Sequence, residues 1–225
     1  VPQIGAVAPD FVADVLGLTP DHIKVNLDFD TAKDAWSIAT GNYSSRFSSA
    51  TAVACQMAAK KVKAKLARIA SPGLNVPPDQ LEFADGLIFD QNNPDNSMKF
   101  YRAAGAAHWT PGNLPEGMEP CVRETGSWSP PELESPNDKD QINTSLTYAF
   151  VFDFCGIEID RETAEVRIDK YVTMHDSGTL LNPLIAEGQV HGAFAWAVGC
   201  ALYEEFVYGE DGSFLTGTFA DYLIP

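Results

Sequence analysis

The sequence contains no pair of closely spaced cysteines. Its four cysteines, Cys55, Cys121, Cys155 and Cys200, are far apart and form no Cys-x-x-Cys motif. Iron-sulfur clusters and structural zinc sites usually depend on such pairs, so the sequence argues against either group being held within this chain alone. We expect the four thiols to be reduced and mostly buried rather than joined in a disulfide framework.

Long apolar runs and basic residues are also scarce. No apolar run reaches the ~20 residues that a membrane-spanning helix needs, and no signal peptide with a basic start and an apolar centre is present. The 225 residues include 15 Lys and Arg against 31 Asp and Glu, a formal net charge of -16. This charge opposes binding to nucleic acid or to an anionic membrane. We therefore expect a cytoplasmic protein with no nucleic-acid partner and no membrane span.

Several catalytic motifs are missing as well. There is no Gly-x-Ser-x-Gly elbow, no Walker loop and no glycine fingerprint of a dinucleotide fold, so hydrolase, kinase and nicotinamide-dehydrogenase functions have no support. His175 and His191 lack a carboxylate cluster at ligand spacing, and we expect them to be structural rather than metal ligands. The residues alone therefore name no catalytic residue and no metal ligand.

Apolar periodicity predicts helices and strands in the first part of the chain. With 45% hydrophobic and 11% aromatic residues, the composition is sufficient for a core. Helical spacing predicts a helix over 4–16 with Gly17 at its end, and alternation predicts a strand over 23–27. After a polar loop, a long amphipathic helix is expected over 47–69, ended by Ser71-Pro72-Gly73.

Prolines separate this part from a second ordered region. Residues 72–142 hold ten of the fifteen prolines and show one strand pattern, near 81–89. Beyond them we expect two strands joined by a turn at Asp160-Arg161-Glu162-Thr163, a helix over 185–203 and a final hairpin over 205–219. The sequence thus predicts an α+β fold of mixed sheets and packed long helices. Its predicted parts are 1–72 (helix, strand, loop and helix), 73–142 (an irregular excursion) and 143–225 (strand hairpin, glycine-rich helix and terminal hairpin).

The first candidate site is the loop that leads into the long helix. It consists of Thr40, Gly41, Asn42, Tyr43, Ser44, Ser45 and Arg46. Free backbone N–H groups, the helix dipole, two hydroxyls and a guanidinium would converge there, a combination that suits a phosphate or another anionic group. An ordinary capped helix with a surface arginine explains the same residues.

The second candidate site is Gln189, which lies among glycines near the start of the later helix. Its amide can donate to and accept from a flat heterocycle, while Gly188 and Gly192 would admit that ligand close to the backbone. Close packing of a neighbouring element against the glycines is the alternative explanation. Trp109, Trp128 and Phe100 could line an aromatic pocket, but we expect them in the core.

Two runs of sequence strongly resemble the molybdopterin-binding subunit of xanthine oxidase and bacterial molybdenum hydroxylases. The first runs from Tyr171 through Met174-His175-Asp176-Ser177-Gly178 to Asn182-Pro183, and the second is Gly188-Gln189-Val190-His191-Gly192-Ala193-Phe194, followed by Ala201-Leu202-Tyr203-Glu204-Glu205. The loop at 40–46 and the opening helix resemble the same family in the same order. The resemblance implies part of the second molybdopterin-binding domain of such a subunit.

The resemblance also implies an activity and its cofactors. Such enzymes insert a water-derived oxygen into a C–H bond of an aldehyde, an aromatic or an N-heterocyclic substrate at a molybdenum centre. The cofactor would be molybdopterin, as the cytosine dinucleotide, and partner subunits or domains would carry iron-sulfur clusters and FAD. By similarity, Thr40–Arg46 would hold the pterin and molybdenum end of the cofactor, and Gln189 would hydrogen-bond the pterin edge.

The resemblance leaves two family features unmatched. A glycine-glutamine-glycine loop is expected before Val1 and a general-base glutamate beyond Pro225, in the remaining part of the subunit, so no catalytic residue is assigned here. Glu187, Glu204 and Glu205 are expected to be solvated carboxylates. Two other functions remain open, a cofactor-free structural or assembly module and a binding domain for a different phosphorylated ligand.

Overall fold

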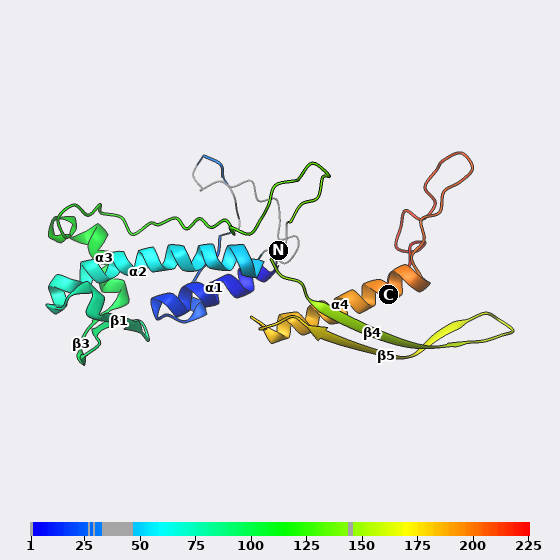
Figure 1. Cartoon of the computed structure of the whole chain (residues 1–225), viewed down its shortest axis with the longest axis horizontal. Helices are drawn as coiled ribbons and strands as arrows, with labels where there is room; N and C mark the ends of the chain where they lie inside the picture. Colours follow the sequence, from blue (N-terminus) through cyan, green and yellow to red (C-terminus); the bar gives the residue numbers. More distant parts are fainter. Residues whose placement is uncertain (1, 27, 29, 33–46, 144–145) are drawn as a thin grey trace. The chain divides into compact units, whose positions relative to one another are not determined.

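The computed structural model describes residues 2–26, 28, 30–32, 47–143 and 146–225. The chain divides into two compact units, Val1–Ala149 and Phe150–Pro225. Figure 1 shows helices and small antiparallel sheets in the chain, and the predicted α+β class is confirmed. Among the described residues, no helix combines the length and the apolar character needed to cross a membrane.

The first helix, α1, spans Pro2–Leu16 and confirms the predicted helix over 4–16. Gly17 ends it with φ +64°, and a Cβ at this position would collide with the backbone carbonyl of Phe83, so only glycine fits there. The predicted strand over 23–27 is wrong for its described residues. A 3-10 turn, Pro20–His22, is followed at 23–26 by backbone that joins no sheet.

The long helix begins with a π-helical turn, η3 (Phe47–Thr51), and continues as α2 (Ala52–Leu74). The predicted stop at Ser71-Pro72-Gly73 is wrong, because α2 passes through these residues. It ends where Asn75 takes a left-handed conformation with φ 54° and its N–H bonds the carbonyl of Ser71. Asparagine tolerates this conformation well, which makes it an alternative to glycine as a helix terminator.

A three-stranded antiparallel sheet follows α2. Its strands are β1 (Leu81–Ala84), β2 (Leu87–Asp90) and β3 (Asn93–Lys99), in the order β1-β2-β3, and helix α3 (Phe100–Trp109) comes next. The sequence predicted one strand near 81–89. Asp85 and Gly86 both have positive φ, 50° and 72°, and form a tight hairpin turn that divides this run into two strands.

The core of the first unit lies between α2, the sheet and α3. Leu66, Ile88 and Ala103 are 0–1% exposed and pack with Ala70 and Phe83. Phe100 packs against this cluster, as expected. Trp109 and Trp128 are 70% and 42% exposed, so the expectation that they lie in the core is wrong.

The second unit is a long hairpin with one helix. Strands β4 (Phe150–Ile159) and β5 (Val166–Asp176) pair antiparallel, and helix α4 spans Pro183–Leu202. The predicted turn is confirmed: Asp160 Oδ1 accepts hydrogen bonds from the N–H groups of Glu162 and Thr163. The final hairpin is reduced to one bridge, between Tyr208 and Phe214.

The four cysteines are all free. Cys55 and Cys121 are half-buried, whereas Cys155 and Cys200 are exposed, so the expectation that most of the thiols are buried is wrong. Burial raises the pKa of the Cys55 thiol.

Candidate functional site

The connection from β5 to α4 is held by short polar contacts within the loop. Asp176 Oδ1 accepts a hydrogen bond from the N–H of Gly178 at 3.1 Å, and Gly178 takes φ +64°. Asn182 Oδ1 accepts from the N–H of Ile185 at 3.1 Å and so caps α4, with Pro183 at the first helical position. These residues fix where α4 begins and therefore where the residues of its second turn lie.

Gln189 lies on an open side of α4. Its side chain is exposed, as are Gly188 and Gly192. Residues three and four positions apart share a helix face, so Gln189 and these two glycines form one patch. Apart from each glycine's chain neighbours and the nearby backbone of α4 itself, no heavy atom of the described residues lies within 4 Å of where a Cβ on either glycine would stand. A flat ring could therefore approach the backbone beside an amide that both donates and accepts hydrogen bonds.

The alternative explanation for the glycines, close helix packing, applies at Gly199 instead. A Cβ there would collide with the Glu204 carboxylate and lie 2.9 Å from Cδ of Pro225. Glu204 also accepts a hydrogen bond from the hydroxyl of Tyr222 at 2.5 Å, so the expectation that it is a solvated carboxylate is wrong. This hydrogen bond, more than desolvation, raises the pKa of Tyr222.

Aromatic contact holds α4 against the hairpin. The rings of Tyr171 on β5 and Phe194 on α4 lie 4.5 Å apart between centroids, at 42°. Desolvation, followed by a hydrogen bond with Asp153, raises the pKa of Tyr171. Because Phe194 follows Gln189 by little more than one helical turn, this contact fixes the part of α4 that carries the amide.

The histidines take part in local bonds. His175 Nε2 and the Thr173 hydroxyl lie 2.8 Å apart on β5, and His191 is exposed on α4. Within the part of the chain that the structure describes, no three His, Cys, Asp or Glu side chains gather in a way that could hold a metal ion.

The first candidate loop, Thr40–Arg46, lies outside the described residues. It belongs to the first unit, whereas Gln189 belongs to the second. Their meeting around one ligand therefore stays a prediction. The described residue that directly follows the loop is Phe47, which is 6% exposed and begins η3.

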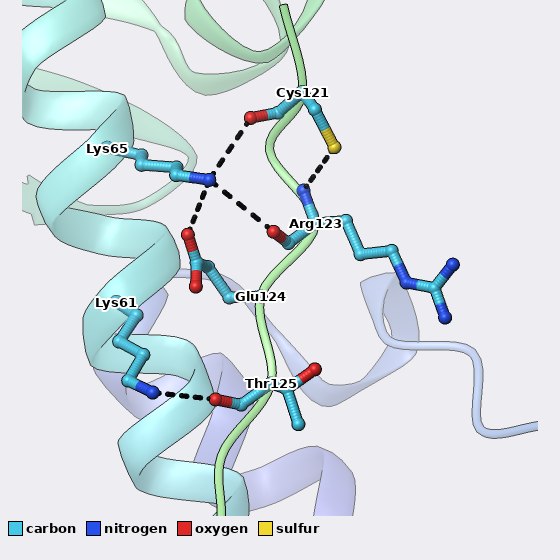
Figure 2. A network of polar contacts seen from close by, with 6 residues as sticks. All are labelled: Lys61, Lys65, Cys121, Arg123, Glu124 and Thr125. Atoms are coloured by element: carbon cyan, nitrogen blue, oxygen red, sulfur yellow. Dashed lines mark hydrogen bonds and ion pairs between the residues drawn. The ribbon is translucent and has the colours of Figure 1, made fainter. Parts of the chain in front are cut away.

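Sequence reasoning missed a polar strap, residues 119–128, that lies along α2. Figure 2 shows Lys61 and Lys65 of α2 pointing at this segment. Lys61 Nζ donates to the carbonyl of Thr125 at 2.7 Å, and Lys65 Nζ lies 2.5 Å from the Glu124 carboxylate. The strap itself has no periodicity that could have predicted it.

Comparison with known proteins matches almost the whole chain to one family. The family model described as "Molybdopterin cofactor-binding domain" matches residues 6–225. Subunit gamma of the 6-hydroxypseudooxynicotine dehydrogenase complex from Paenarthrobacter nicotinovorans is 32% identical over 99% of this chain and 26% of its own length. The carbon monoxide dehydrogenase large chain from Afipia carboxidovorans is 29% identical over 95% of this chain and 24% of its own length.

Solved structures of similar proteins also align with almost the whole chain. Quinoline 2-oxidoreductase from Pseudomonas putida 86 aligns with a TM-score of 0.73 and 25% identity, over 99% of this chain and 26% of that one. Reconstituted CO dehydrogenase from Oligotropha carboxidovorans aligns with a TM-score of 0.73 and 27% identity, over 99% and 25%. The chain thus spans about a quarter of the length of the relatives that it matches.

Proposed function

The chain belongs to the molybdopterin cofactor-binding domain family, and from this premise we propose that it forms one wall of the cofactor site in a molybdenum-dependent hydroxylase or dehydrogenase. The observation that carries the proposal is the patch on α4, where the amide of Gln189 stands beside two glycines with open space around their backbone. A pterin has a flat edge with both donors and acceptors, which matches what this patch offers.

Gln189 would bind the pterin edge and orient it. The two adjacent glycines allow the ring to lie close to the helix, because a larger side chain at either position would occupy that space. The Asn182 cap and the contact between Tyr171 and Phe194 hold in place the part of α4 that carries Gln189. Preorganisation of this kind lowers the entropic cost of binding.

The loop Thr40–Arg46 would bind the other end of the same cofactor. Backbone N–H groups at a helix start, the hydroxyls of Ser44 and Ser45 and the guanidinium of Arg46 all favour an anionic, oxygen-rich group. The chain has a formal net charge of -16, so a local concentration of donors is what permits an anion to bind at all. The cytosine dinucleotide form of the cofactor is part of the same proposal.

The bound cofactor would supply the two-electron oxidation of the substrate, and this chain would supply position and electrostatics. We assign no general base to the described residues, and that role would fall to a glutamate elsewhere in the complete subunit. The substrate would be a small aromatic, N-heterocyclic or aldehyde compound. Partner subunits or domains carrying iron-sulfur clusters and FAD would accept the electrons. The assembled enzyme would lie in the cytoplasm.

The test is the metal and pterin content of the purified native complex that contains this chain. Gln189→Ala should lower both contents together, and Glu187→Ala, an exposed carboxylate on the same helix, is the matched control. Loss of one hydrogen bond to the pterin corresponds to about 1 kcal/mol, so roughly fivefold weaker retention is expected. Full, equal retention in both variants would contradict the proposal and favour a cofactor-free structural module.

A further inference from the structure

The hairpin of the second unit carries a row of large apolar side chains on one face. Side chains alternate between the two faces of a strand, so Phe150, Phe152 and Phe154 of β4 point the same way. Across the sheet, Phe152 is paired with Met174 of β5 and Phe154 with Val172, and paired residues share a face. Together these side chains form an apolar ladder, in which the rings of Phe152 and Phe154 lie 4.9 Å apart between centroids.

The apolar ladder faces away from helix α4, which lies along the hairpin (Figure 1). Tyr171 is adjacent to Val172 in β5 and therefore points to the opposite face, where its ring contacts Phe194 of α4. The three phenylalanines of the ladder are 57–75% exposed, and Met174 is 66% exposed. The helix of the second unit thus covers one face of the hairpin and leaves the ladder in solvent.

The exposed area of the ladder is large for a free surface. An aromatic side chain has about 200 Å² of surface, so the exposed parts of the ladder amount to roughly 500 Å². Contiguous apolar patches of this size on a soluble protein mark interaction surfaces. A two-stranded sheet without further cover is also only marginally stable in water. Both observations indicate that this face of the hairpin is covered by a partner.

The charges around the ladder restrict the chemistry of that partner. Residues 150–225 contain 13 Asp and Glu against three Lys and Arg, so the second unit is strongly acidic. Asp176 stands at one end of the ladder and Lys170 at the other, and Arg167 is already paired with Glu158. Complementary charges favour association and like charges oppose it. A partner with an apolar centre and with lysine or arginine at its margins therefore fits this face.

A second copy of this chain is a poor match for the ladder. Two copies would bring two acidic units together, and a stable interface usually buries about 800 Å² on each side, more than the ladder supplies. A segment of the same polypeptide needs a smaller area, because covalent linkage gives it a high effective concentration. This chain spans 26% and 24% of the two relatives described above, so most of such a subunit lies outside the matched region.

We propose that an apolar segment of the complete subunit, from outside residues 1–225, packs on the ladder and carries basic residues at its margins. Among the described residues of the first unit, large exposed apolar side chains occur singly along the sequence, so none of them forms a comparable ladder. The proposed segment closes the face of the hairpin opposite α4. Its docking does not depend on the cofactor, so it can be tested separately from the proposed function.

The first test is photo-crosslinking within the purified native complex. A benzoylphenylalanine in place of Phe152 keeps an aromatic side chain in the ladder and reacts with whatever lies against it. The expected product joins this position to a peptide of the same subunit, outside residues 1–225, that has lysine or arginine near the crosslink. The same probe in place of Phe219, an exposed phenylalanine outside the ladder, is the control and should not give this product. A crosslink to a second copy, to residues 1–149 or to another subunit, or no crosslink at all, would overturn the proposal.

Hydroxyl-radical labelling gives a second readout that needs no substitution. In the native complex, the three ladder phenylalanines and Met174 should lose most of the labelling that they show in the denatured complex, because the docked segment excludes solvent from them. Phe152→Ser should restore labelling of Phe154 and Met174, whereas Phe219→Ser should leave it at the wild-type value. Ladder residues labelled as strongly in the native as in the denatured complex would overturn the proposal. Neither readout depends on the molybdenum or pterin content, so failure of the proposed function leaves this test intact.

Discussion

Tyr171 on β5 and Phe194 on α4 are in ring contact, with centroids 4.5 Å apart. This pair joins α4, the only helix described in the second unit, to the hairpin. Residues Phe150–Phe154 of β4 and much of α4 are exposed. Few contacts therefore hold α4, and each of them has a large influence on where Gln189 lies.

Phe194→Ala is expected to loosen α4 from the hairpin. Loss of an aromatic contact and of its buried area should lower the free energy of unfolding by about 1–3 kcal/mol. Hydrogen exchange of α4 amides, measured alongside denaturant unfolding, checks this. Tyr171→Phe keeps the ring and should have a clearly smaller effect, so equal effects from the two variants would contradict the importance of the ring contact.

Asn182→Ala is expected to fray the start of α4. The Asn182 side chain accepts from the N–H of Ile185, and removal of such a cap costs about 1 kcal/mol. Faster amide exchange over residues 184–187 is the measurement. Asn182→Ser retains a capping oxygen and should restore most of the protection, whereas similar exchange in the alanine and serine variants would show that the cap contributes little.

Ile88→Ala is expected to be the most destabilising of these changes. Ile88 is 0% exposed at the centre of the first unit, where its removal leaves a cavity. Loss of about 2–5 kcal/mol in the free energy of unfolding follows from large-to-small substitutions in cores. Ile142→Ala, at a side chain that is 52% exposed, is the control and should change stability by less than about 0.5 kcal/mol.

Asp160→Asn is expected to remove part of the acid dependence of stability. Two backbone N–H bonds, from Thr163 and then Glu162, hold the pKa of Asp160 below its ordinary value of 3.8. Because the folded pKa is lowered, the ionised carboxylate stabilises the hairpin above pH 3.8, and this contribution disappears as the pH falls through the folded pKa. The difference in free energy of unfolding between wild type and Asp160→Asn, measured by denaturant unfolding at several pH values, should therefore become smaller in acid. A difference that grows in acid would contradict a stabilising role for the ionised Asp160 carboxylate.

Local patterns in the sequence predict the long elements well. Helical spacing predicts α1 and α4, and the turn residues Asp160–Thr163 predict the hairpin, because the signals for these elements lie within a few adjacent residues. The end of α2 was misplaced because Pro72 is a strong helix breaker in isolation, whereas the left-handed conformation of Asn75 determines the actual end.

Long-range contacts were beyond local reasoning. The strap contacts α2 through lysines that are typical of any solvated helix face, and its most restrictive position, Gly126, has no distinctive neighbours in sequence. At the candidate site, the sequence pointed to Gly188, Gln189 and Gly192 but left two explanations for the glycines open: close approach of a ligand, or close packing of a neighbouring element. The open space around the two glycines distinguishes them from Gly199, where packing is close.

A high-resolution structure of the native complex, with its bound cofactor, tests the central claim most directly. The account predicts one molybdopterin that accepts or donates a hydrogen bond at the Gln189 amide and also contacts residues of the segment 40–46. A cofactor held at neither place, or α4 covered at Gly188 and Gly192 by protein instead of a ligand, would contradict it.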